Sequence, residues 1–285
     1  QIMIKVNNLT YSYSDSDTVV LRDLTFEISK GEIFALLGPT GSGKSTILKI
    51  LFKLLRSYQG DILIDGVSLN DIGQTHFHRF GANFEAVNHN LNLTALESLE
   101  YSSAFYPKEN ILNLTNLFYS VGLSEDSNRK LGAFSSEMNT RLNIIRAVMH
   151  DPDTILLDEP FTGLDPVNAF KVKKLILELK NRGKTILITT NNLTIADELC
   201  DRVTFIVQGS NKLTNTPQIL KLNHGKELIR VESKDGSVED FPANRIGDNI
   251  AFHNFIEKQN VKRITTLEAT LEDVFLSVTS EMNRL

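Results

Sequence analysis

A glycine-rich turn at residues 38–46 reads Gly38-Pro39-Thr40-Gly41-Ser42-Gly43-Lys44-Ser45-Thr46. Its first eight residues match the pattern G-x-x-x-x-G-K-[ST], in which a backbone loop and a lysine surround phosphate groups. The turn follows Glu32–Leu37, which has the character of a short buried strand, and precedes Lys44–Arg56, where apolar side chains recur at helical spacing. Because strand, turn and helix follow in the order that the pattern requires, the stretch predicts a phosphate-binding loop in an α/β fold.

Each part of this loop has a chemical role toward a nucleoside triphosphate. The backbone N–H groups of residues 38–46 can close around phosphate oxygens, and the start of the following helix adds positive potential. Lys44 is expected to place its charge on the phosphates, and the Ser45 hydroxyl is expected to ligate Mg²⁺. The sequence therefore predicts a nucleotide and Mg²⁺ as cofactors, with the whole turn in the binding site.

A second group of candidate site residues lies at the end of another apolar strand. Residues Ile155–Leu157 are continuously apolar, and Asp158 and Glu159 follow them. Asp158 is the expected carboxylate partner of the metal ion. A carboxylate in the position of Glu159 can orient a water molecule and accept its proton. Lys44 and Glu159 are therefore candidate catalytic residues.

The remaining patterns predict a layered α/β architecture. Period-two alternation over residues 1–30 and 60–70 indicates an antiparallel layer. From about residue 85 to 150 the pattern is mainly helical. The apolar strands Ile155–Leu157 and Thr185–Ile188 are separated by the helical pattern Val167–Asn181, which is typical of a parallel βαβ unit in a sheet covered on both faces.

A change in composition after residue 221 indicates a second, smaller domain. Polar alternation and turns such as Lys234–Ser237 replace the long apolar runs. The final helical pattern begins at Thr270, and Asp273 lies at the spacing of a helix cap. We expect one domain at residues 1–221 and an α+β appendage at residues 222–285.

Composition bears on partners and location. The chain has 285 residues, 41% of them hydrophobic, and a formal net charge of −5 with interspersed signs. A nucleic-acid surface needs clustered Lys and Arg, so no nucleic-acid partner is expected. The apolar runs are far shorter than the roughly 20 residues of a membrane-spanning helix, and the start of the sequence lacks a secretory signal pattern. We expect a cytoplasmic location, with any membrane contact made through another protein.

A phosphate loop alone also fits a small-molecule kinase or a GTPase, but two further stretches narrow the choice. Residues Arg141–Ala147 and Asp158–Pro166 closely resemble the run from signature helix to D-loop in ABC ATPases. The resemblance continues in order over residues 1 to about 220. It implies a P-loop NTPase fold with an antiparallel β subdomain and a helical subdomain, ATP as the nucleotide, and ATP hydrolysis coupled to transport.

The same resemblance implies partners. Two such subunits sandwich two ATP molecules, each between the phosphate loop of one chain and the signature loop of the other, where Ser135 lies in this chain. Tyr13 is implied to stack on the adenine ring, with the neighbouring Tyr11 as the alternative. A separate transmembrane permease is the other implied partner, which implies a peripheral position on the inner face of the cell membrane.

Two further resemblances concern the direction of transport. The tail, ending in Thr270–Leu276, resembles the appendage of ABC subunits that serve exporters. Residues Asn83–His89, followed by Leu93 and Thr94, are similar to a subgroup described as fluoroquinolone or peptide-antibiotic exporters. These resemblances imply export, whereas the cargo stays open because the permease would form the transport pathway.

Two positions near the expected site depart from the general ABC pattern. Glu85 stands where a glutamine usually senses Mg²⁺ and the γ-phosphate, and lantibiotic-immunity ATPases are similar in having a glutamate here. A glutamate keeps an oxygen ligand for the metal but adds a negative charge. Asn191 stands at the place of the switch histidine that touches the γ-phosphate. Its amide can donate a hydrogen bond, but it is shorter than imidazole and carries no positive charge.

The third departure lies in the signature loop, which reads Phe134-Ser135-Ser136-Glu137-Met138 where the family has roughly Leu-Ser-Gly-Gly-Gln. Ser135 is kept, but Glu137 replaces the glycine nearest to the γ-phosphate held by the partner subunit. At roughly 4 Å and an effective dielectric constant of about 20, two like charges repel by about 4 kcal/mol. Either the Glu137 side chain turns away or closure of the dimer weakens.

Together the departures favour slow or asymmetric hydrolysis. They also favour a heterodimer over a homodimer, because a heterodimer separates the changes at Glu137 and Asn191 between its two sites. The alternative is a nucleotide-binding regulatory or immunity subunit with little turnover. An ABC ATPase of DNA repair or translation is disfavoured, since the segment between Lys44 and Asp158 is too short for a long helical arm.

Overall fold

The computed structural model describes residues 1–14, 18–73, 78–84, 90–225 and 227–282. The chain divides into two compact units, Gln1–Thr214 and Asn215–Leu285. Helix α7 (Pro217–His224) packs against the final helix α9 (Leu271–Met282), so both belong to the second unit. The expected boundary at residue 221 falls inside α7, and the second unit begins a few residues earlier than expected.

A six-stranded sheet forms the centre of the larger unit. Its strand order is β10-β9-β3-β8-β7-β6, and the neighbours from β9 to β6 pair in parallel. The strands are β3 (Ile33–Leu37), β6 (Phe80–Asn83), β7 (Thr154–Asp158), β8 (Thr185–Thr190), β9 (Arg202–Val207) and β10 (Ser210–Asn215). Every residue of β3, β7 and β8 is buried, as expected for strands covered on both faces. The predicted parallel βαβ unit is confirmed as β7, α5 (Pro166–Asn181) and β8.

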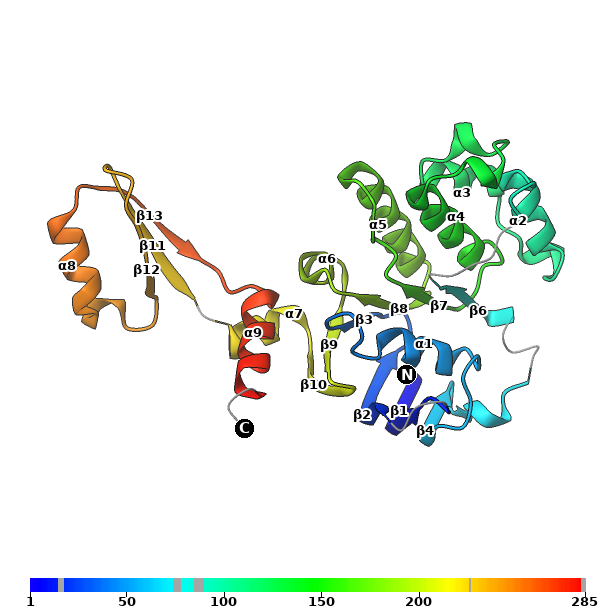
Figure 1. Cartoon of the computed structure of the whole chain (residues 1–285), viewed down its shortest axis with the longest axis horizontal. Coiled ribbons are helices and arrows are strands. Elements are labelled where there is room, and N and C mark those ends of the chain that lie inside the picture. Colours follow the sequence, from blue (N-terminus) through cyan, green and yellow to red (C-terminus); the bar gives the residue numbers. More distant parts are fainter. Residues whose placement is uncertain (15–17, 74–77, 85–89, 226, 283–285) are drawn as a thin grey trace. The chain divides into compact units, whose positions relative to one another are not determined.

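The predicted antiparallel layer is confirmed as a second, four-stranded sheet of order β2-β1-β4-β5. Its strands are β1 (Ile2–Ser12), β2 (Val19–Ser29), β4 (Gln59–Ile64) and β5 (Val67–Ser68), and each pairs antiparallel with its neighbours. In Figure 1 the strands β1, β2 and β4 lie on the same side of the six-stranded sheet as helix α1 (Lys44–Leu51).

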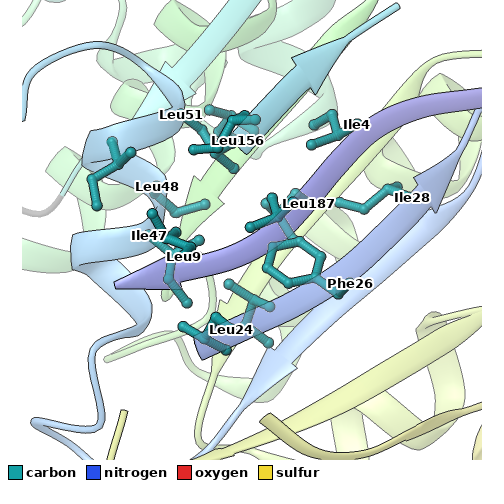
Figure 2. Close-up of a cluster of buried hydrophobic side chains, with 14 of the residues drawn as sticks. Ile4, Leu9, Leu24, Phe26, Ile28, Ile47, Leu48, Leu51, Leu156 and Leu187 are labelled. Atoms are coloured by element: carbon teal, nitrogen blue, oxygen red, sulfur yellow. The ribbon is translucent and has the colours of Figure 1, made fainter. Parts of the chain in front are cut away.

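A large apolar core holds α1 against both sheets. Ile47, Leu48 and Leu51 of α1 are fully buried in this core (Figure 2). The other labelled members are Ile4, Leu9, Leu24, Phe26 and Ile28 from the antiparallel layer, and Leu156 and Leu187 from β7 and β8. Because Lys44 is the first residue of α1, the same core fixes the end of the phosphate loop.

The helix after the loop is shorter than predicted. The apolar pattern predicted a helix to Arg56, but α1 ends at Leu51. Lys53 has a φ of 57°, in the left-handed region, and Leu54 is 57% exposed. The Lys53 ammonium donates to the carbonyl oxygen of Ile72 at 2.7 Å. The chain just after the helix is thus in contact with a segment 19 positions further along the sequence. The predicted extension was therefore wrong.

Three α-helices lie within residues 90–150, the part of the predicted helical region that the structure describes. They are α2 (Ala95–Ser103), α3 (Leu114–Ser120) and α4 (Ser136–Val148), and Figure 1 shows them gathered together. Helix α4 packs on β6 and β7, while α2 and α3 contact α4, and α3 also contacts α5. A further helix, α6 (Leu193–Leu199), contacts β3. The start of α4, which carries the signature loop, is thereby attached to the same sheet as the phosphate loop.

The smaller unit is an α+β fold, as expected. Its sheet, of order β12-β11-β13, consists of β11 (Leu228–Ser233), β12 (Val238–Pro242) and β13 (Val261–Leu267), and α8 (Ile250–Lys258) lies between β12 and β13 in the chain. Thr270 and Asp273 cap α9 reciprocally, with backbone-to-side-chain hydrogen bonds of 2.8 and 3.2 Å, which confirms the predicted cap. Across the described parts of both units, no helix combines the length and apolar character of a membrane span.

Candidate functional site

The phosphate loop leaves β3 and packs tightly against neighbouring strands. Gly43 has a φ of 102°, and a Cβ atom there would lie 2.5 Å from Cδ2 of Leu21. A Cβ atom on Gly38 would lie 2.2 Å from the carbonyl oxygen of Ile206 in β9. Because neither position has room for a side chain, glycine is required at both ends of the loop.

Lys44 lies at the centre of the site. Its side chain is 6% exposed, and its ammonium donates to the carbonyl oxygens of Gly38 at 2.7 Å and Pro39 at 3.0 Å. The ammonium is also 3.7 Å from a carboxylate oxygen of Glu159. Burial lowers the pKa of Lys44, while the nearby carboxylates of Glu159 and Asp158 oppose that shift. The lysine charge is thus placed where the loop and the acidic strand end meet.

Asp158 and Ser45 are brought together from distant parts of the chain. The Ser45 hydroxyl donates to a carboxylate oxygen of Asp158 at 3.0 Å, and the Thr189 hydroxyl donates to the same oxygen. Mg²⁺ prefers oxygen ligands and is usually held by one or two carboxylates together with water and phosphate oxygens. Ser45 and Asp158 therefore fit such an ion, whereas the third predicted ligand, Glu85, lies outside the described residues.

Glu159 is held in a strained backbone conformation beside Lys44. Its φ is 45°, and its backbone N–H donates to the carbonyl oxygen of Thr189 at 3.1 Å and to the Thr189 hydroxyl at 3.0 Å. Its carboxylate accepts from the backbone N–H of Asn191 and from the Thr162 hydroxyl, each at 3.4 Å. Burial raises the pKa of Glu159, and the Lys44 charge opposes the rise. A non-glycine residue with positive φ at this point is typical of a functional site.

These groups face one cavity of about 860 Å³. Its lining includes the following residues that the sequence predicted: Tyr13, Thr40, Gly41, Gly43, Lys44, Ser45, Thr46, Asp158, Glu159 and Asn191. The cavity is large enough for a nucleotide-sized ligand and holds the loop, the carboxylates and an aromatic ring. The structure thus brings most of the predicted site together in one place.

The structure also distinguishes between the two candidate tyrosines. Tyr13 is 38% exposed and lines the cavity, and its hydroxyl is 3.1 Å from the hydroxyl oxygen of Thr46. Tyr11 is only 7% exposed, and its ring meets that of Tyr13 edge to face at 5.1 Å between centroids. Of the two rings, that of Tyr13 has the surface that an adenine could contact.

Some predicted residues lie around the cavity but do not line it. Gly38, Pro39 and Ser42 form the body of the loop, and the first two accept the hydrogen bonds of Lys44. Ser135 is the N-cap of α4, and its hydroxyl accepts from the backbone N–H of Met138 at 3.2 Å. Ser135 does not line the cavity, although the next residue, Ser136, does.

The sequence prediction missed a polar face of α4 that lines the same cavity. Ser136, Asn139, Thr140 and Asn143 contribute to this lining, and Asn143 is only 7% exposed. Their spacing of three, four and seven residues puts them on one face of a helix. That polar spacing, in a helix whose other buried residues are mostly apolar, is the signal that could have identified them.

Comparisons of sequence agree with this geometry. The family model described as ABC transporter matches residues 21–162. A fluoroquinolones export ATP-binding protein of Mycobacterium tuberculosis is 38% identical over 281 residues, covering 97% of this chain and 93% of that protein. The lantibiotic transport ATP-binding protein SrtF of Streptococcus pyogenes is 32% identical over 209 residues, covering 73% of this chain and 88% of that protein. The resemblance drawn from the motifs is confirmed.

Comparisons of structure agree as well. A structure described as the ATP-binding subunit of an ABC transporter is 28% identical, with a TM-score of 0.69, covering 77% of this chain and 92% of that one. A dimeric ATP-binding cassette, in a post-hydrolysis state bound to ADP and Pi, is 27% identical, with a TM-score of 0.66, covering 75% of this chain and 98% of that one. These likenesses confirm the predicted P-loop fold class.

Proposed function

Because this chain belongs to the ABC transporter family as an ATP-binding protein with ATPase activity, we propose that it drives an exporter by ATP-dependent dimerisation beside a separate membrane permease. The observation that carries the proposal is the single cavity that joins the phosphate loop to Asp158 and Glu159. Export as the direction of transport is supported by the likeness to the fluoroquinolones export protein over almost the whole chain.

In this function the loop and its surroundings bind ATP. The loop amides and Lys44 hold the phosphates, and the Tyr13 ring, exposed on the cavity, stacks on the adenine. Ser45 and Asp158 hold Mg²⁺, with Glu85 as a further ligand. When bound, the ion neutralises charge that develops on the phosphates.

Hydrolysis then depends on Glu159 and Asn191. Glu159 orients the attacking water and accepts its proton, and the upward shift of its pKa makes the carboxylate a stronger base than an exposed one. Asn191, whose backbone N–H contacts Glu159, donates its side-chain amide to the terminal phosphate in place of a histidine. Because an amide cannot carry the positive charge of imidazolium, we propose that turnover is slow.

ABC ATPases work as dimers together with a permease, and we propose that the second subunit is a different ABC ATPase. Ser135, in the signature loop at the start of α4, serves the partner's ATP. In a heterodimer the phosphate loop of this chain meets an intact signature loop, whereas Glu137 meets the partner's nucleotide. The chain then lies on the cytoplasmic face of the membrane, attached through the permease.

Binding of Mg·ATP tests this proposal most directly. Lys44→Ala is expected to weaken binding about a hundredfold, because it removes a buried charge beside the phosphates. The matched control is Lys49→Ala in the last turn of the same helix, which should bind as wild type does. Isothermal titration calorimetry measures both affinities. Isolation of the chain from membranes is expected to yield a polytopic permease together with it.

Two results would contradict the proposal. One is a wild-type chain with no measurable affinity for Mg·ATP. The other is equal affinity in wild type and Lys44→Ala, because the loop would then have no part in binding.

A regulatory or immunity subunit with little turnover is the second candidate, and the changes at Glu137 and Asn191 favour it. Glu159→Gln separates the two functions. An active pump loses transport in this variant, because the proton acceptor is gone. A binding switch keeps its effect, because it needs only nucleotide binding.

A further inference from the structure

Glu137, the acidic residue of the signature loop, is bound by its own chain. It lies in the first turn of α4 with a side chain that is 26% exposed. One of its carboxylate oxygens accepts from the Asn168 side-chain amide at 2.6 Å and lies 3.4 Å from a guanidinium nitrogen of Arg141. The carboxylate is therefore held toward the start of α5.

Arg141 provides a fixed positive charge for this contact. Its side chain is 8% exposed, and one guanidinium nitrogen donates to the carbonyl oxygens of Val121 and Gly122, each at 2.9 Å. The same nitrogen donates to the side-chain oxygen of Asn168 at 3.1 Å. Since the backbone fixes the guanidinium, Glu137 meets a charge that is already in position, which favours a stable pair.

Asn168 is the residue that connects the parts of this network. Its amide nitrogen donates both to Glu137 and to a carboxylate oxygen of Asp165, each at 2.6 Å, while its amide oxygen accepts from Arg141. The reverse orientation would place the amide oxygen against two carboxylates, so the hydrogen-bond partners determine the orientation. Asp165 is the N-cap of α5 and lies near the end of Asp158–Pro166, the stretch that resembles the D-loop region of ABC ATPases.

We propose that Asn168 is a positioning residue for ATP hydrolysis: it holds the Glu137 carboxylate against α5 and so lets a signature loop with an acidic residue approach the nucleotide of a second subunit. This inference rests on the proposed function, because the approach takes place only in an ATP-bound dimer. It explains how a carboxylate is accommodated where the family has glycine. Arg141 and Asn168 partly neutralise the Glu137 charge and hold it turned away from the partner's nucleotide. The site therefore hydrolyses ATP faster than it would if the carboxylate rotated freely.

The test is a double-mutant cycle of ATPase activity, using the full chain with the subunits that accompany it from the membrane. Every variant also carries Glu159→Gln in this chain, so that the measured turnover comes from the site that Glu137 faces. Asn168→Ala is expected to lower kcat about tenfold when Glu137 is present, and less than about threefold in a Glu137→Gly background. Asn168→Asp, which keeps the shape but replaces the donor by a carboxylate, should lower kcat at least as much as alanine does. Mg·ATP affinity of the isolated chain should stay within about twofold, because the phosphate loop is untouched.

Asn181→Ala, the same substitution at the other end of α5, is the matched control and should leave kcat unchanged. Rescue by Glu137→Gly excludes misfolding as the cause of the loss. An unchanged kcat in Asn168→Ala, or an equal loss in both backgrounds, overturns the inference while the proposed function stands. Absence of Mg·ATP binding by the wild type overturns the proposed function, and this inference with it.

Discussion

At the scale of single residues, the site combines an ordinary phosphate loop with an unusual residue at position 191. Asn191 is exposed and lines the cavity, and its backbone N–H lies 3.4 Å from a carboxylate oxygen of Glu159. Because the backbone makes this contact, any residue except proline at position 191 can form it with Glu159, the proposed proton acceptor. The side chain alone therefore decides how strongly this position stabilises charge on the terminal phosphate.

Replacing that side chain by histidine should make the enzyme faster. Asn191→His is expected to raise kcat about three- to tenfold, because imidazole reaches farther and can carry a positive charge. Steady-state ATPase assays measure the change, with Asn191→Ala as the control that removes the amide without adding a ring. Equal turnover in the histidine and alanine variants would show that the side chain at this position does not contact the reacting phosphate.

At the scale of elements, the loop between β3 and α1 depends on close packing as well as on backbone freedom. Gly41 and Gly43 both have positive φ, of 82° and 102°. A Cβ atom on Gly41 meets nothing within 4 Å, whereas one on Gly43 would collide with Leu21. A side chain at Gly41 would therefore cause backbone strain alone, whereas a side chain at Gly43 would cause both backbone strain and a steric clash.

This difference predicts unequal losses of stability. Gly43→Ala should lower the free energy of unfolding by about 1 kcal/mol more than Gly41→Ala, because only the former adds a clash to the strain. Urea unfolding followed by circular dichroism measures both variants. If the two substitutions cost the same, the contact between Gly43 and Leu21 does not constrain the loop.

At the scale of the whole molecule, the proposed asymmetry concerns which subunit completes each site. Ser135 and Glu137 lie in the signature loop at the start of α4, and Lys44 and Glu159 line the cavity of the phosphate loop. A homodimer would combine Glu137 and Asn191 in both of its sites. A heterodimer with an intact partner would place only one of the two changes in each site.

Turnover should therefore depend on the partner subunit. Alone, the chain is expected to hydrolyse ATP slowly, and addition of the ABC ATPase isolated with it from membranes should raise the rate by about tenfold or more. Glu159→Gln in this chain should remove most of that gain, because it disables the site that pairs this phosphate loop with an intact signature loop. Brisk, cooperative hydrolysis by the chain alone would contradict the asymmetric proposal.

Much of the fold was predictable because local patterns determine local backbone. The strand before the phosphate loop, the helix between β7 and β8, and the cap of Thr270 on α9 all follow from residues close in sequence. The end of α1 did not, since the apolar spacing continues past Leu51 while the chain turns away. A helical pattern indicates which side chains could share one face of a helix. It does not indicate the residue at which contacts with a distant segment end that helix.

By itself, the sequence determined that the chain has a phosphate loop, an acidic strand end and a signature loop with a glutamate in it. Three features could be seen only in the folded chain: Ser45 contacts Asp158 across 113 positions, Tyr13 rather than Tyr11 lines the cavity, and Asn168 binds Glu137. The physical reason is that residue type and spacing specify the chemical groups and the local backbone. The direction of each side chain depends on neighbours that folding brings from elsewhere in the chain.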